Sequence, residues 1–167
     1  MKIIATRIVL WVLVVLWMVV IFSFSAENAE ESLETSDGIV DVVVEQLLED
    51  KKDAMSETEY DSFKMKVSHF VRKSAHFTAY MILGTLSTSA LLTHNIKKTT
   101  MSILSLGICF LYAVSDEIHQ VFVPGRAGRF SDVMIDTSGA VLGILLCLGT
   151  VYVIRRLKNK NSHFTGE

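Results

Sequence analysis

Long apolar runs separated by polar stretches dominate the chain. Four runs, at about residues 4–24, 74–92, 101–120 and 131–154, are long enough to cross a bilayer, which takes about 20 helical residues. Apolar residues are nearly continuous within each run, a pattern typical of membrane-spanning helices rather than of amphipathic surface helices. We therefore predict one all-α membrane domain over residues 1–167, built as a four-helix transmembrane bundle.

The segment 25–73, between the first two runs, is the least membrane-like part of the chain and holds most of the 18 acidic residues. Apolar residues from Ile39 to Leu48 recur there at near-helical spacing, which predicts an amphipathic helix lying against the membrane or the bundle. Ser56 and Glu59 have capping-box spacing, so a second helix should begin near Ser56 and continue into the next apolar run. We expect an extracytoplasmic helical segment here.

Basic residues near the two ends set the expected orientation. Lys2 and Arg7 precede the first run, and several basic residues at 155–160 follow the last, so both termini should be cytoplasmic. The first run is longer than a usual signal core, and no small residue lies three positions before a cleavage point at Ala26 or Ala29. We therefore expect an uncleaved anchor of a multi-pass protein.

Composition narrows the possible functions further. The net charge of -2 leaves no broad basic surface for nucleic acid. Cys109 and Cys147 both fall inside apolar runs, which favours small packing residues over a secreted disulfide framework. Between the third and fourth runs, Pro124 and Gly125 predict the centre of a type II turn.

Ionisable side chains gather at one level of the predicted bundle. His76, Asp116 and Asp136 lie about 24, 22 and 27 Å from the inner ends of their helices, at 1.5 Å per residue. That common level is near the outer face of the hydrocarbon region. Charged groups are costly there, so these side chains should face the bundle interior or a wet cavity.

Helical phase groups further side chains around these three. The sets that share a face are His69, Arg72, Lys73, His76 and Tyr80 on the helix of the second run; Tyr112, Asp116, His119 and Gln120 on the third, with Glu117 a quarter turn away; and Asp132, Asp136, Gly139 and Gly143 on the fourth. The two glycines form a small-xxx-small pair, which lets another helix approach closely.

These residue types offer acid–base and anion-binding chemistry. The candidate catalytic residues are His76, Asp116, Glu117, His119, Asp132 and Asp136. The candidate substrate-binding residues, suited to a phosphate or carboxylate, are Arg72, Lys73, Tyr80, Gln120, Arg126 and Arg129. No tight metal-spacing motif such as HExxH is present, so no metal ligand is assigned and the cofactor stays open. Salt bridges that merely hold the helices together would use the same residues.

Two stretches resemble the motifs of VanZ-like proteins. Arg72-Lys73-Ser74-Ala75-His76-Phe77, with Tyr80 and Gly84, is similar to the first, and Tyr112-Ala113-Val114-Ser115-Asp116-Glu117-Ile118-His119-Gln120 to the second. Residues 121–129 and the spaced Asp132, Asp136, Gly139 and Gly143 continue the second motif, and Phe22-Ser23-Phe24-Ser25 also fits. The resemblance covers about residues 70–143 and leaves 26–65 outside.

This resemblance implies a bacterial protein of the cytoplasmic membrane. The family is named after a protein linked to low-level resistance to teicoplanin, a lipid-bearing glycopeptide, but the resemblance implies no mechanism or oligomeric state. Three functions stay open: an enzyme acting on a membrane lipid or lipid-linked envelope precursor; a non-catalytic protein that binds such a lipid, the lipoglycopeptide or a partner; and a small-solute transporter. The last is disfavoured because no inverted repeat or broken helix pair is visible.

Overall fold

The computed structural model describes residues 2–26, 29–48, 55–124 and 128–164, and the regular structure within these ranges is entirely α-helical. Its helices, in chain order, are α1 (Lys2–Ala26), α2 (Ala29–Leu48), α3 (Glu57–Leu92), α4 (Lys98–Gln120) and α5 (Phe130–Phe164). The all-α prediction is confirmed. The basic tail is also helical, because α5 continues ten residues beyond the predicted end at 154.

Within the described residues, three helices are long and apolar enough to cross a membrane: Ile3–Ala26, Lys98–Gln120 and Phe130–Lys160. They correspond to the first, third and fourth predicted runs. The second run, 74–92, forms the C-terminal part of α3, where serines, threonines and His76 dilute the apolar residues. A fourth crossing by α3 therefore stays a prediction.

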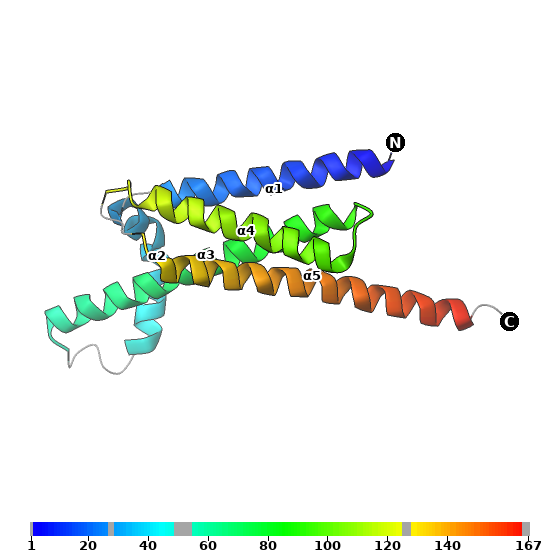
Figure 1. Cartoon of the computed structure of the whole chain (residues 1–167). Helices are drawn as coiled ribbons and strands as arrows, with labels where there is room; N and C mark the ends of the chain where they lie inside the picture. The colour runs from blue at the N-terminus through cyan, green and yellow to red at the C-terminus, as the bar shows by residue number, and fades with distance from the viewer. Residues whose placement is uncertain (1, 27–28, 49–54, 125–127, 165–167) are drawn as a thin grey trace.

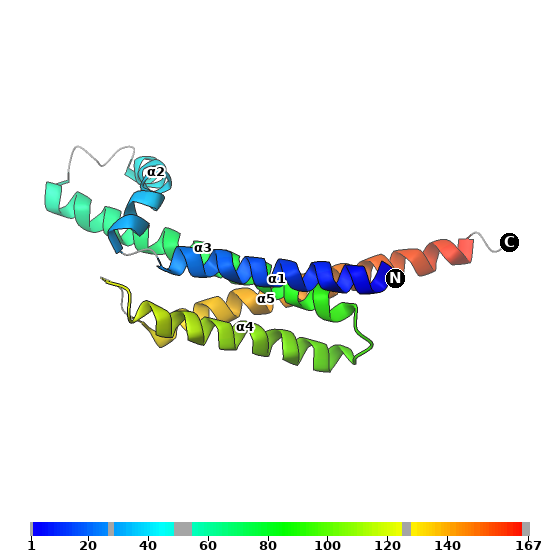
Figure 2. The same ribbon diagram turned by 90° about the horizontal axis from the view of Figure 1, so that it is seen from above.

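The helices α1, α4 and α5 and the C-terminal part of α3 lie side by side (Figures 1 and 2). The most extensive packing is between α3 and α5, and α3 also contacts α1, α2 and α4. The N-terminal half of α3 and α2, which crosses it, project beyond the end of the bundle where α1 and α4 finish (Figure 1). The start of α1 and the end of α5 lie at the opposite end (Figure 1). We call the end that carries α2 and the N-terminal half of α3 the hairpin end.

The predicted start of α3 is confirmed by its cap. The Ser56 hydroxyl accepts a hydrogen bond from the Glu59 backbone N–H at 3.4 Å, and the Ser56 N–H donates to the Glu59 carboxylate at 3.0 Å. The helix α2 begins at Ala29, ten residues before the predicted amphipathic stretch. Its apolar face packs on α3, where a cluster of buried side chains comprises Val40, Val44, Leu48 and Val67.

Glycines allow α3 and α5 to approach backbone to backbone. A Cβ added to Gly139 or Gly143 of α5 would overlap the carbonyl oxygen of Phe77 or Met81 on α3. From the other side, a Cβ on Gly84 would overlap the carbonyl of Ala140. The small-xxx-small pair therefore does what its spacing predicts, and its partner is α3.

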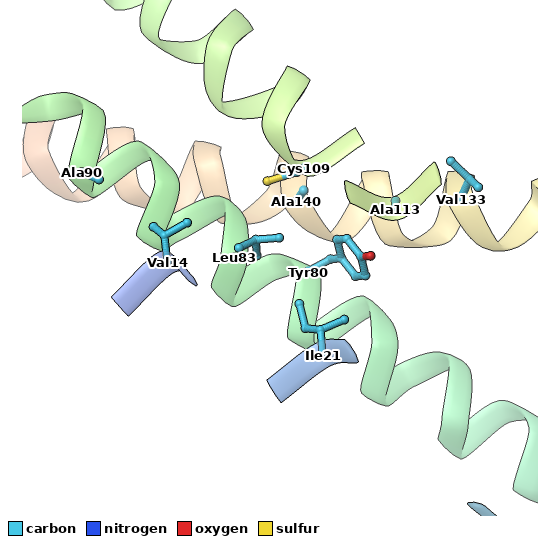
Figure 3. Packing of buried hydrophobic residues seen from close by; sticks show 9 residues of the cluster. All are labelled: Val14, Ile21, Tyr80, Leu83, Ala90, Cys109, Ala113, Val133 and Ala140. Atoms are coloured by element: carbon cyan, nitrogen blue, oxygen red, sulfur yellow. The ribbon is translucent and has the colours of Figure 1, made fainter. Parts of the chain in front are cut away.

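The apolar core centres on Tyr80 and Leu83 of α3, both fully buried (Figure 3). Side chains from α1, α4 and α5 surround them, namely Val14, Ile21, Cys109, Ala113, Val133 and Ala140. Cys109 and Cys147 are both buried free thiols, as expected of packing residues. Of the predicted Pro124-Gly125 turn, Gly125 lies outside the described residues.

Polar contacts attach α1 to the rest of the bundle. The Trp17 indole N–H donates to the Ala79 carbonyl at 2.8 Å, and the Tyr112 hydroxyl donates to the Met18 carbonyl. At the end that carries the termini, Arg7 donates to the carbonyl oxygen of Thr93. These bonds fix the rotation of α1, so its last turn faces the polar residues of α4.

Candidate functional site

Three side chains from three helices meet near the hairpin end of the bundle. His76 of α3, Asp116 of α4 and Asp136 of α5 each offer an oxygen or nitrogen atom, and these atoms lie within 4.8 Å of one another. The His76 Nδ1 is 3.9 Å from the Asp136 Oδ2. The helical rise predicts that these three residues lie at one level of the bundle, and the structure brings them together. We call them the buried triad.

The carboxylates around this point are withdrawn from solvent. Asp116 is 2% exposed, Asp136 4%, Glu117 7% and Asp132 8%. A buried carboxylate is costly unless it is paired, hydrogen-bonded, protonated or bound to a metal. The partners of each carboxylate therefore decide what the site can do.

Asp132 has its own set of partners one helical turn from Asp136. The Lys73 ammonium forms an ion pair with Asp132, and the Ser131 hydroxyl donates to the same carboxylate at 3.3 Å. The carboxyl group of Glu117 lies within hydrogen-bonding reach of Asp132. We call Lys73, Glu117 and Asp132 the ion-pair group; it joins the same three helices as the buried triad.

A hydrogen-bonded chain connects the buried triad to α1. The Gln120 amide donates to the Ser25 hydroxyl at 2.7 Å and to the Asp116 Oδ2 at 3.4 Å. Ser25 is fully buried at the end of α1. From the sequence, Ser25 belongs only to a stretch that resembles the VanZ-like motifs and has no expected role in the site, because no spacing along the chain links it to Gln120.

Tyr80 lies one turn along α3 from His76 and is fully buried. Its hydroxyl points away from Leu83, to the side of the view on which Ala113 and Val133 lie (Figure 3). Asp116 and Asp136 both lie near this phenol. Among the described residues, no side chain or backbone group forms a hydrogen bond with the hydroxyl oxygen.

Other predicted site residues lie around this centre rather than in it. The His119 ring packs against Phe22 of α1, with ring centroids 4.5 Å apart. Arg72 is half-buried, and Arg129 is exposed where α5 begins. Arg126 lies outside the described residues.

The arrangement combines two kinds of chemistry. The buried triad pairs an imidazole with two carboxylates, a set that can hold a proton or bind a cation. Arg72 and Arg129 have the guanidinium fork that suits phosphate or carboxylate groups. The same contacts also join α3, α4 and α5, so a structural contribution accompanies any chemical one.

Comparison with known proteins gave one match. The sequence model of the VanZ/LLP1 family matches residues 10–154, which include all of α2, α3 and α4, α1 from residue 10 onward and α5 up to residue 154. Neither curated proteins nor solved structures gave a match.

Proposed function

The chain belongs to the VanZ/LLP1 family, and from this premise we propose that it is a bacterial envelope protein that lowers susceptibility to teicoplanin-type lipoglycopeptides. In this proposal it crosses the cytoplasmic membrane four times, with both termini in the cytoplasm. The hairpin end then faces outward, where it binds the anionic headgroup of a lipid or a lipid-linked envelope precursor.

The observation that carries the proposal is the gathering of buried ionisable groups at one end of an otherwise apolar bundle. Asp116 and Asp136 lie about one to two helical turns, or 6–9 Å, inside that end at 1.5 Å per residue. Ionisable residues at membrane depth are expensive and mark functional sites by default. The half-buried Arg72 precedes Lys73 on α3 and the exposed Arg129 directly precedes α5, and their guanidinium groups suit an anionic headgroup.

The proposal is tested by teicoplanin susceptibility in a sensitive bacterial host. The host carries empty vector, the wild-type chain, Asp116→Asn, or the control Lys158→Gln in the exposed basic tail, each at matched membrane levels. Wild type and Lys158→Gln should protect, whereas Asp116→Asn should not. Unchanged susceptibility with wild type would refute the resistance role, and protection by Asp116→Asn would refute the role of the polar end.

A second candidate, chemical modification of the headgroup, is favoured by the proximity of His76 to two carboxylates. An imidazole held near a carboxylate is a common general acid–base device. Mass spectrometry of envelope lipids separates the two functions. Modification requires a lipid species that appears with wild type and disappears with His76→Gln, whereas binding alone leaves the lipid composition unchanged.

A further inference from the structure

We propose that the buried triad of His76, Asp116 and Asp136 binds one divalent transition-metal ion of the zinc or manganese class. Ligand atoms around an ion bound at about 2.1 Å lie at most about 4.2 Å apart. The triad atoms already lie within 4.8 Å of one another. Small side-chain rotations, which close gaps of less than about 1 Å, therefore complete the coordination.

The donor set points to this class of metal. An imidazole nitrogen suits zinc, iron, copper and nickel, while carboxylate oxygens suit manganese and magnesium. One imidazole with two carboxylates is a mixed set with a net charge of -2, which a dication neutralises. The ligands come from α3, α4 and α5, about 20–40 residues apart, so no compact motif could have revealed them.

Tyr80 gives a second and independent indication of a ligand. Its side chain is fully buried, its hydroxyl shares the surroundings of Asp116 and Asp136, and no described residue hydrogen-bonds to it. A buried hydroxyl without such a bond costs about 1–3 kcal/mol. A metal ion, or a water molecule bound to it, would satisfy this oxygen.

Neighbouring side chains form hydrogen bonds to the buried triad of the kind that orient metal ligands. Gln120 donates to the Asp116 Oδ2 and is itself held by Ser25. Such outer hydrogen bonds orient ligating carboxylates in metal sites. Lys73 is committed to Asp132, so the nearby ammonium does not take the place of the dication at Asp136.

The metal proposal concerns the same end of the bundle as the proposed function but does not depend on it. Three protein ligands leave open coordination positions, which a phosphate oxygen of a headgroup or a water molecule can occupy. Metal binding can be measured on purified protein without lipid substrate or antibiotic. A failure of one proposal therefore leaves the other testable.

The test uses the full chain, purified in detergent and stripped with a chelator that is then removed. Zinc and manganese are each added, excess ion is removed by gel filtration, and retained metal is measured by mass spectrometry. Cobalt serves as a spectroscopic probe, because its visible absorption reports bound ligands. We expect about one ion per chain. If the folded wild-type protein retains neither zinc nor manganese, the proposal is wrong.

Variants then assign the ligands. Asp116→Asn, Asp136→Asn and His76→Gln should each weaken metal affinity at least about tenfold. The matched control is the double variant Lys73→Met/Asp132→Asn, which removes the carboxylate one turn away together with the ammonium that pairs with it and should keep the ion. Near-wild-type thermal unfolding of the variants shows that they are folded. Equal metal affinity in wild type and an Asp116→Asn/Asp136→Asn double variant would overturn the assignment.

Discussion

Replacing Gly143 with alanine tests whether α3 and α5 are held by direct backbone contact. The new Cβ would overlap the Met81 carbonyl oxygen and would lie 3.0 Å from the Thr85 backbone nitrogen. Both atoms belong to the main chain of α3, so no side chain can rotate away to make room. The helices must separate, and overpacking of this kind costs about 1–3 kcal/mol.

The matched control is Gly149→Ala on the same helix. A Cβ added to Gly149 meets nothing within 4 Å. Alanine is favoured over glycine within a helix by about 0.5–1 kcal/mol, and this gain applies to both variants. The difference between Gly143→Ala and Gly149→Ala therefore isolates the packing cost.

The assay is thermal unfolding of detergent-solubilised protein, followed by tryptophan fluorescence. One kcal/mol corresponds to about 2–4 °C for a chain of this size, so Gly143→Ala should unfold about 2–12 °C below Gly149→Ala. Gly149→Ala itself should match or exceed the wild type. Equal unfolding temperatures for the two variants would refute the close contact between α3 and α5.

Two further predictions concern polar contacts. Ser25→Ala removes the acceptor of the Gln120 amide and should destabilise the protein by about 1–3 kcal/mol in the same unfolding assay. The control Ser23→Ala removes only an exposed hydrogen bond within α1 and should have almost no effect. Equal losses of stability in the two variants would contradict the Ser25 contact. The pKa of Glu59 is held below its ordinary value of 4.5 because its carboxylate accepts hydrogen bonds from Ser56, chiefly from the backbone N–H and secondly from the hydroxyl. The stabilisation by the cap is therefore fully present above about pH 4.5 and is lost as the pH falls through the lowered pKa. An NMR titration should show the lowered value and a rise in Ser56→Ala, whereas an unshifted wild-type value would contradict the capping box.

Local signals made much of the fold predictable. The positions of the apolar runs gave α1, α4 and most of α5, because a spanning helix is defined by its own composition and length. The capping box at Ser56 located the start of α3, since both partners lie within one turn. The pattern from Ile39 to Leu48 found only the second half of α2, because residues 29–38 contain few apolar side chains to show a helical period.

The sequence predicts how deep each site residue lies along its helix and which helical face carries it, but not which helices are in contact. Rise per residue places His76, Asp116 and Asp136 at one level, and phase assigns each to a face. Neither quantity says which helices are neighbours. The bond between Ser25 and Gln120 joins residues 95 positions apart, and the packing of His119 on Phe22 likewise depends on where α1 docks. Such contacts follow from the assembly of the bundle, which one sequence does not encode in a local pattern.

The ion pair between Lys73 and Asp132 has a consequence for biogenesis. Roughly 60 residues separate the two partners, which corresponds to about 3–12 s of synthesis at 5–20 residues per second. During that interval α3 is a weakly apolar segment whose Lys73 ammonium has no carboxylate partner from α5. In contrast, α1 is apolar enough to enter the lipid without a partner helix. In the proposed four-crossing topology, we expect α3 to settle in the bilayer only when α5 emerges and supplies both the carboxylate and the glycine surface, so α3 waits for the last helix to be made.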